Sequence, residues 1–478
     1  MAGRFGVGWT LHGDGSAPAP GRSVRPDERL SWPLTIGLGI QHVVAMFGAT
    51  FVFPTVMGLD ANLAVMMSGL ATVVFLLIVK GKIPSYLGTS AAFVGSVAAI
   101  RAAGGSTPTV LGAIVVSGLV MAAFGILVHT VGARLIHRLF PPAVSGAVVL
   151  LIGFNLAPVV SGTYWPQDQW VAFATMSVVV AATALLRGFW ARIAIVLGLL
   201  FGFALSWCLD RLSGPIHAPD AAGHLSEHFR VDLSGVMNAP WFGLPHMQAP
   251  DFRTSAVLMA LPALVALIAE NTGHVKAVAE MTHTDLDSSL GRAIAADGLT
   301  TALSAAVGGA PTTTFAENIG VMAATRVYST AAYWVAAAVA VLFGLCPKFG
   351  ALVAATPGGV LGGITVVLYG MIGLLGAKIW IANRVDFNDP VNLVSVATGT
   401  VMGIGGTSLQ LSGTFTINGI ALGTLVTLIT YHLLRTRTSR RVPLPPSHHD
   451  RPARDRPEAG QATALAPAAP LPPSPASR

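Results

Sequence analysis

The sequence predicts an all-α polytopic membrane protein with about fourteen transmembrane spans. Of the 478 residues, 53% are hydrophobic and only 10% are charged, whereas soluble chains carry roughly 25% charged residues. The 53 glycines point the same way, because small residues let membrane helices approach closely. The two cysteines, Cys208 and Cys346, fit neither a disulfide framework nor a metal-ligand spacing. We therefore expect packing thiols and no metal site.

A helix needs roughly 20 apolar residues to cross the hydrocarbon core. Runs of this kind begin near Trp32, and the first continues as a full-length span rather than a cleavable signal peptide. The predicted spans are 32–56, 61–80, 84–100, 108–131, 142–160, 168–187, 190–209, 254–279, 293–308, 311–327, 329–346, 357–377, 388–405 and 416–434. They divide the chain into a first block of seven spans at 31–209, a loop at 210–252 and a second block at 253–434. The segments 1–30 and 435–478 are rich in Pro and charge and are expected to be disordered.

Positive charge predicts the orientation of these spans. With the N-terminus inside, 23 of the 28 Lys and Arg residues fall in inside segments and 5 in outside segments. Such a bias places the positive side in the cytoplasm. Both termini are therefore expected to be cytoplasmic and the loop at 210–252 external. Because eight of these residues lie in the tail after Leu434, the net charge of +7 does not indicate nucleic-acid binding.

The second half of the chain repeats the first. PPAVSGAVVLLIG at 141–153 aligns without gaps to GGVLGGITVVLYG at 358–370, and Pro84 and Pro311 open the two short spans. Seven spans per repeat is an odd number, so the second copy is inverted in the membrane. Inverted repeats with interrupted spans at matching positions are typical of transporters that bind their substrate at the midplane. A half-helix that starts there also presents free N–H groups to the interior.

Ionisable residues inside a membrane are costly, so each is a candidate for function. Glu270 and His274 lie four residues apart on one helix face. Glu317 follows the interruption of the tenth span, and His42 lies in the first span. A carboxylate beside an imidazole in a low-dielectric pocket suits a group that binds and releases a proton.

Other polar residues are open to a structural interpretation. A helix-packing hydrogen bond explains Gln41 and His42 as well as a functional role does. Asp297 is expected near the cytoplasmic end of its span, with a structural role. No nucleophile–base pair or metal-ligand cluster is visible, so an enzyme is not predicted.

At these residues the chain resembles a known family. QHVVAMFGAT, PSYLGTSAAF, AENTGHVKAVAE and ENIGVMAATR look like motifs of the nucleobase–ascorbate transporter family, also called nucleobase–cation symporters. The last matches the family signature through Glu317, Asn318, Gly320 and Thr325. The resemblance runs from about Leu30 to Leu434 and is strongest to bacterial uracil and pyrimidine permeases.

The resemblance implies a fold in which spans 1–4 and 8–11 form a core domain and spans 5–7 and 12–14 form a gate domain. Short strands in the third and tenth spans would meet at the substrate. It also implies roles for individual residues. Glu270, Glu317, Phe315, Tyr369 and the backbone N–H groups of Ala91 and Ala316 would bind the base, Glu270 and His274 would couple a proton, and Gln41, His42, Asn318 and Thr325 would support the site. Ala91 stands where the family usually has Phe, and Phe315 where it usually has Tyr.

The expected function is import of uracil or a related pyrimidine base across the cell (plasma or inner) membrane by proton symport, without a further cofactor. A purine or xanthine permease of the same family is the alternative, although Glu317 counts against it because those members more often carry Gln there. An anion exchanger of related fold and a membrane sensor are other classes; two acidic groups oppose an anionic substrate, and the tail has no recognisable signalling domain. Family members often form homodimers through the gate domain, so a homodimer is a further expectation.

Overall fold

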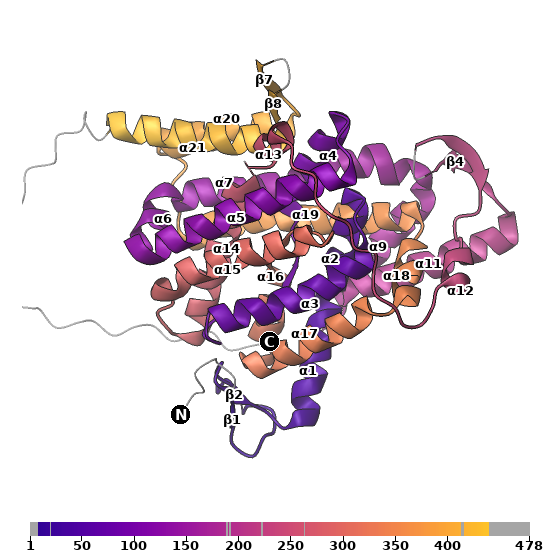
Figure 1. Ribbon diagram of the computed structural model, residues 1–478, viewed down its shortest axis with the longest axis horizontal. Coiled ribbons are helices and arrows are strands. Elements are labelled where there is room, and N and C mark those ends of the chain that lie inside the picture. The colour runs from indigo at the N-terminus through magenta and orange to yellow at the C-terminus, as the bar shows by residue number, and fades with distance from the viewer. Residues whose placement is uncertain are drawn as a thin grey trace, which may run out of the picture. The chain divides into compact units, whose positions relative to one another are not determined.

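The computed structural model describes residues 8–19, 21–187, 190, 193–220, 223–261, 263–412 and 415–438, and most of these are helical (Figure 1). The helices and single turns are α1 Trp32–Ala45, α2 Phe47–Met57, α3 Ala61–Ile78, η1 Ala91–Phe93, α4 Val94–Ala102, α5 Thr107–Val131, α6 Arg134–Leu139, α7 Pro142–Phe154, α8 Ala157–Val159, the π-helical turn η2 Val160–Tyr164, η3 Trp165–Gln167, α9 Gln169–Leu185, α11 Ala194–Ser213, α12 Ser234–Asn238, α13 Thr254–Ala260, α14 Ala263–Thr282, α15 Asp287–Ala306, α16 Ala316–Thr325, α17 Thr330–Gly344, α18 Pro347–Ala354, α19 Gly358–Ala382, α20 Pro390–Ile404 and α21 Gly419–Thr438. The strands are β1 Thr10–Leu11, β2 Glu28–Arg29, β3 Leu87–Thr89, β4 Ile216–Pro219, β5 Leu225–His228, β6 Thr312–Thr314, β7 Ser408–Ser412 and β8 Phe415–Asn418.

Seven helical segments of the described chain are long and apolar enough to span a membrane, or eight if α17 and α18, which meet at 80°, form one broken span. The segments are Trp32–Met57, Ala61–Ile78, Thr107–Val131, Pro142–Gln167, Ala194–Ser213, Thr254–Thr282 and Gly358–Ala382. The other predicted spans coincide with α4, α9, α15, α16, α20 and α21, which do not meet this criterion on their own. The chain is therefore a mostly helical membrane protein, and the count of fourteen crossings stays a prediction.

The most extensive helix packing joins the two halves of the chain. α5 packs along α15, α3 along α17, and α7 along α19; the labels of each pair lie close together in Figure 1. Smaller contacts join α1 to α17, α13 to α5, α9 to α19 and α20 to α7. These contacts come in matched sets. Exchanging each first-half span for its second-half counterpart turns α5–α15 into α17–α3, α1–α17 into α13–α5, and α9–α19 into α20–α7.

Glycines explain how closely α5 and α15 pack. The backbone of α15 lies against Gly118 and Gly125 of α5, and the backbone of α5 lies against Gly291 and Gly298 of α15. A side chain at any of these four positions would collide with the facing backbone. Small residues at such interfaces are the usual means by which membrane helices gain van der Waals contact, since lipid offers no hydrophobic driving force for helix association.

The strands implied for the third and tenth spans are present and meet. β3 and β6 form an antiparallel pair, in the register Leu87–Thr314, Gly88–Thr313 and Thr89–Thr312. The pair satisfies backbone groups where both helices are interrupted, which is a requirement inside a membrane. The all-α prediction did not include the other described strand pairs, which are β1–β2, β4–β5 and β7–β8.

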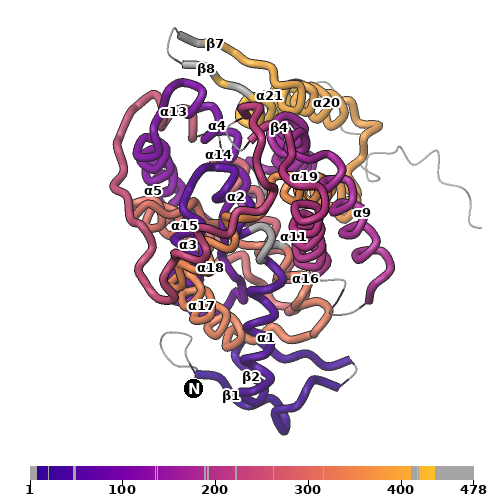
Figure 2. The backbone as a smooth tube through the Cα atoms, turned by 90° about the vertical axis from the view of Figure 1, so that its right-hand side faces the viewer, coloured from indigo at the N-terminus to yellow at the C-terminus, as the bar shows by residue number. Residues whose placement is uncertain are grey.

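The segment 1–30 is predicted to be disordered, and for its described part that prediction is wrong. Val24 forms a backbone bridge with Val327, and Trp9 Nε1 donates a hydrogen bond to Thr330 Oγ1 at 2.7 Å. β1 pairs with β2 within this N-terminal strap (residues 8–19 and 21–30). The two strands lie beside the lower end of α1 in Figures 1 and 2. The strap is ordered because the chain between α16 and α17 offers it backbone partners and an apolar contact.

The predicted C-terminal tail at 435–478 is described only in its first four residues, which continue α21 to Thr438. Residues 439–478 lie outside the described part of the chain.

Arg230 organises the loop predicted at 210–252. Its Nε lies 2.7 Å from Asp168 Oδ2 and its Nη1 3.1 Å from Asp210 Oδ1. Asp168 also accepts hydrogen bonds from the backbone N–H groups of Trp170 and Val171 at the start of α9. Desolvation opposes the charged form, but hydrogen bonds to the two carboxylates raise the pKa of Arg230 above its ordinary value. The loop is thereby fixed to α9 and α11.

Candidate functional site

Two helices begin beside the β3–β6 pair. η1 begins at Ala91 and continues as α4, and α16 begins at Ala316. The first turn of a helix has backbone N–H groups without intrahelical partners and carries partial positive charge. α14 packs against both η1 and α16. The helix that carries Glu270 therefore touches both of these helix starts.

Three acidic side chains come together around α14. Glu270 is half-buried near the middle of α14, and Glu317 is half-buried in the first turn of α16. Asp297 of α15 is fully buried. Asp297 and Glu317 both lie close enough to Glu270 for electrostatic repulsion between the carboxylates. Such a cluster is costly in a low-dielectric interior unless protons, donors or a ligand compensate it.

The prediction for Asp297 is wrong in its position. α15 begins at Asp287, six residues before the predicted span, so Asp297 lies mid-helix instead of near an end. Its Oδ2 accepts hydrogen bonds from Asn271 Nδ2 at 3.2 Å and from Thr313 Oγ1 at 3.4 Å. Its Oδ1 is buried without a hydrogen-bond partner among the described residues. Asp297 therefore joins α14, α15 and β6, and sequence reasoning placed it too near the end of its span because the first turns of α15 are polar.

His274 lies one turn after Glu270 on α14, as the spacing predicts, and it is buried. Its Nε2 lies 2.5 Å from Ser85 Oγ. The described residues include no hydrogen bond between His274 and Glu270. The interaction of His274 is therefore with the chain just before β3, and Ser85 is a residue that the sequence did not single out.

His42 and Asn318 hold α1 to α16. Asn318 Nδ2 lies 3.0 Å from His42 Nδ1, and both side chains are buried. The ring of His42 also packs on Tyr333 of α17, with 4.4 Å between ring centroids. These contacts agree with the packing interpretation of His42. Gln41, the preceding residue, is half-buried.

Thr325 lies at the far end of α16 from Glu317. Its hydroxyl donates to the carbonyl of Val321 at 2.8 Å. α16 stops there because Arg326 adopts a left-handed conformation with φ of 57°. Thr325 therefore supports the end of the helix and not the acidic cluster.

Phe315 shapes the strand pair. Its buried ring covers Gly88 of β3, where a side chain would collide with the ring atoms. Gly88 is thus required by the close approach of an aromatic ring. Phe315 lies immediately before Ala316, so its ring stands directly beside the start of α16.

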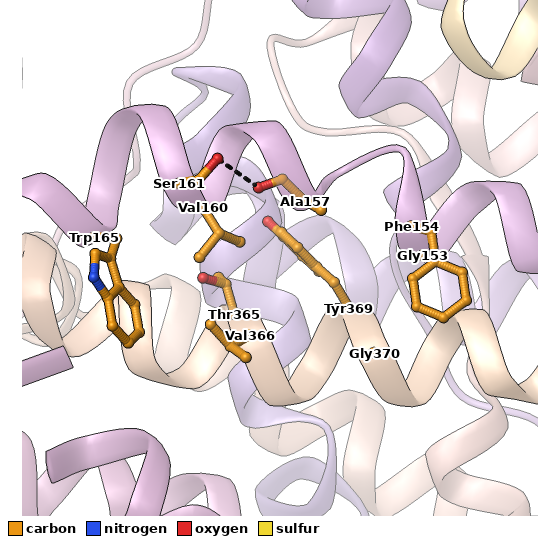
Figure 3. Close-up of a pocket in the computed structure, with 10 residues that line it drawn as sticks. All are labelled: Gly153, Phe154, Ala157, Val160, Ser161, Trp165, Thr365, Val366, Tyr369 and Gly370. Carbon is orange, nitrogen blue, oxygen red and sulfur yellow. Dashed lines mark hydrogen bonds between the residues drawn. The ribbon is translucent and has the colours of Figure 1, made fainter. Parts of the chain in front are cut away.

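Tyr369 lines a cavity between α7–η2 and α19 (Figure 3), and the residues that line this cavity include none of the three acids. This cavity has a volume of about 410 Å³, and Phe154 and Trp165 contribute aromatic walls. Tyr369 projects from α19 towards the opposite helix, near Ala157 (Figure 3). Its ring stacks on Phe53 of α2 at 6.1 Å between centroids, and its hydroxyl is buried without a partner among the described residues.

A second cavity, of about 320 Å³, lies beside α4. Its lining includes Ala92, which follows Ala91, and Ala263, which lies two turns before Glu270 on α14. Asn155 also lines it, and its side chain donates to the carbonyl of Gly403. This cavity therefore lies between α4 and α14 on one side and the end of α7 and the start of α21 on the other.

A helical bundle in which two interrupted spans meet through paired strands, with carboxylates nearby, is typical of membrane transport proteins. Solved structures share the fold. The transmembrane domain of the cyanobacterial bicarbonate transporter BicA matches with a TM-score of 0.54 at 15% identity, over 83% of this chain and 96% of that one. The murine anion transporter Slc26a9 matches with a TM-score of 0.59 at 13% identity, over 85% of this chain and 69% of that one.

Sequence relatives define the family. Residues 34–412 match the permease family. RutG of Escherichia coli K12, a protein named as a pyrimidine permease, is 44% identical over 90% of this chain and 96% of its own. The uracil permease of the same strain is 35% identical over 85% and 92%, and that of Bacillus caldolyticus is 34% identical over 82% and 90%. The chain belongs to this permease family, the nucleobase–ascorbate transporters that its motifs indicated, and it is a transporter rather than an enzyme.

Proposed function

We propose that this permease is a secondary active transporter that imports uracil or a related pyrimidine base by proton symport. The observation that carries the proposal is the position of Glu270 and Glu317, two half-buried carboxylates beside helix starts. The names of relatives that match 85% or more of this chain, a uracil permease and a pyrimidine permease, support the substrate class.

The chemistry of the base fits these groups. Uracil has two ring N–H donors and two carbonyl acceptors. Glu270 and Glu317 accept hydrogen bonds from the ring N–H groups, and the backbone N–H groups at Ala91 and Ala316 donate to the carbonyls. A desolvated site of this kind strongly rejects analogues that lack a matching group. Phe315 provides an apolar wall beside the start of α16.

The proposed architecture has fourteen spans arranged as two inverted repeats, with both termini in the cytoplasm. The matched packing of α5–α15 with α17–α3, and of α9–α19 with α20–α7, supports it. An exchange of halves that preserves the contacts is what a pseudo-two-fold axis requires. In this arrangement Tyr369 belongs to the gate domain and approaches the base when the gate and core domains close together. A homodimer through the gate domain completes the proposal.

Protons are the proposed coupling ion. Glu270 and His274 bind and release the proton. Gln41, His42 and Asn318 hold the helices around them, and Thr325 supports the far end of α16. A proton on the acidic cluster removes an unpaired charge that is expensive to carry through an occluded state. Sodium would need several oxygen ligands.

Anion exchange is the second candidate, because BicA and Slc26a9 share the fold. The acidic cluster argues against it, since Glu270, Glu317 and Asp297 repel an anionic substrate. A purine or xanthine permease remains the alternative within the family. Competition separates the three cases, because bicarbonate, xanthine and uracil each compete only at a site that accepts them.

Uptake into proteoliposomes tests the proposal. Radiolabelled uracil is supplied with an inward proton gradient and no sodium, and unlabelled uracil, thymine, xanthine and bicarbonate are the competitors. We expect uptake that follows the proton gradient and that uracil blocks. Uptake that ignores protons and follows sodium would refute the coupling, and block by bicarbonate alone would refute the substrate class.

Binding measurements test the residues. Glu270→Gln and Glu317→Gln each present a donor where an acceptor is needed, which costs about 1–3 kcal/mol, on the order of ten- to a hundredfold in affinity. Glu280→Gln is the matched control, because Glu280 is exposed on the same helix α14. Unchanged uracil affinity in both site variants would remove the two glutamates from the site.

A further inference from the structure

Ser85 and His274 form a buried pair outside the acidic cluster. Ser85 has no exposed surface and His274 is 4% exposed. The distance of 2.5 Å between Ser85 Oγ and His274 Nε2 is that of a short hydrogen bond. The other ring nitrogen, Nδ1, is buried without a partner among the described residues. The imidazole is therefore held from one side only.

The chemistry of this pair depends on the proton state of the ring. In neutral imidazole one ring nitrogen is a donor and the other an acceptor, so Ser85 donates to Nε2 or accepts from it, according to the tautomer. In the imidazolium both nitrogens are donors. Ser85 then accepts from Nε2 and turns its own hydroxyl proton away from the ring. A bond to a charged donor is the stronger one, so Ser85 favours the protonated ring.

Ser85 is connected to the strand pair through its own chain. The next residue, Tyr86, accepts a hydrogen bond on its carbonyl from the backbone N–H of Phe315 at 3.1 Å. Phe315 is followed by Ala316, the first residue of α16. A change at His274 thus reaches the start of α16 through the residues Ser85, Tyr86 and Phe315.

We infer that Ser85 is a positioning residue that links the proton state of His274 to the paired strands β3 and β6, which lead into the helix starts with the substrate-binding N–H groups. The inference rests on the proposed proton symport. It adds to that mechanism a path by which a proton on α14 alters the geometry of β3 and β6.

α14 and the elements packed against it carry several other titratable groups. Glu270 lies one turn before His274, while Lys276 and Glu280 on the same helix are exposed. The elements packed on α14 are α5, α7, α15, α16, β6 and η1. Their titratable side chains are His129 on α5, Asp287, Arg292 and Asp297 on α15, and Glu317 on α16. Ser85 is the hydrogen-bond partner of His274 among the described residues.

Ser85→Ala tests the inference, and Ser68→Ala is its control. Ser68 Oγ forms an equally buried hydrogen bond, 2.8 Å long, with the hydroxyl of Tyr86, the residue next to Ser85. Both variants lose one buried serine hydroxyl near β3, but only the hydroxyl of Ser85 contacts an imidazole. Uracil uptake is measured in proteoliposomes across a series of external pH values, with folding checked by size-exclusion chromatography.

In Ser85→Ala we expect the pH of half-maximal uptake to fall by about one unit, because a tenfold weaker hold on the proton needs a tenfold higher proton concentration. Ser68→Ala keeps the wild-type pH profile, and Ser85→Thr, which retains the hydroxyl, restores it. In a His274→Ala background, Ser85→Ala has no further effect, since paired residues are not additive.

The outcomes separate the inference from the proposed function. Wild-type uptake that ignores the proton gradient overturns the symport and the inference with it. Proton-driven wild-type uptake with the same pH profile in Ser85→Ala and Ser68→Ala overturns the inference alone. Additive effects in the double variant also overturn it, and they remain measurable if either single variant is less stable.

Discussion

Replacing Arg230 by Ala should destabilise the protein around the 210–252 loop far more than the loss of an ordinary surface charge would. The guanidinium bridges Asp168 and Asp210, and its Nη1 also donates to the carbonyl of Gly214 at 3.3 Å. The Arg230→Ala variant leaves the two carboxylates facing each other without their cation. Asp168 still caps α9 through backbone N–H groups, so the expected loss comes from the ion pairs.

The expected loss of stability in Arg230→Ala follows from the burial of its ion pairs. The Arg230 side chain is 12% exposed, and those of its partners are 9% and 8% exposed. Breaking a fully buried ion pair costs about 3–5 kcal/mol. Residual exposure allows some screening by water, so we expect about 2–3 kcal/mol. Arg230→Lys keeps the positive charge but loses the planar guanidinium group. Its stability should therefore fall between those of the wild type and Arg230→Ala.

Arg253 supplies the matched control. It pairs with Asp251 at 2.9 Å, but the two side chains are 58% and 47% exposed. An exposed pair contributes about 0–1 kcal/mol. Thermal unfolding of the purified variants in one detergent is the assay, with the midpoint shift of Arg253→Ala as the reference. Equal midpoint shifts in Arg230→Ala and Arg253→Ala would refute the argument that burial makes the Arg230 ion pairs contribute more to stability.

Three further predictions concern the site and the strap. Gly88→Ala should abolish uptake at normal membrane abundance, because the added methyl group collides with the ring of Phe315; normal uptake would show that the ring moves aside. Trp9→Phe loses the hydrogen bond to Thr330 and should cost about 1 kcal/mol, seen as a lower melting midpoint; an unchanged midpoint contradicts a stabilising strap. Asp297→Asn keeps an acceptor oxygen but removes a charge near Glu270, so the pH profile of uptake should move while the fold is retained. An unmoved profile would exclude Asp297 from proton handling.

Much of the fold was predictable because its signals are local. Pro84 and Pro311 mark the interrupted spans, and the strands β3 and β6 follow them within three residues. The pairing register was not predictable, since it depends on how Phe315 covers Gly88. The N-terminal strap was missed for a similar reason. Its Gly- and Pro-rich composition indicates disorder, and its order comes from partners such as Val327, which lies about 300 residues away in the chain.

The candidate site was predictable only in part, because contacts between helices determine which side chains come together in it. Glu270 and Glu317 stand out since a carboxylate in an apolar run has no other explanation. Asp297 does not, because the first turns of α15 are polar in sequence, and this conceals that Asp297 itself is buried. Ser85 has no signal at all, since serine is common in packed membrane helices. Only its distance to His274 gives it a role.

The contacts of α14 connect these observations. β6 is linked to α14 through Asp297, which accepts hydrogen bonds from both Asn271 of α14 and Thr313 of β6. The chain leading into the other strand is tied to it through Ser85 and His274. Glu270 directly precedes Asn271 on the same helix, so it lies next to the first of these attachments. We therefore expect a change of charge on α14 to act on both strands at once, and the two helix starts that follow these strands to respond together.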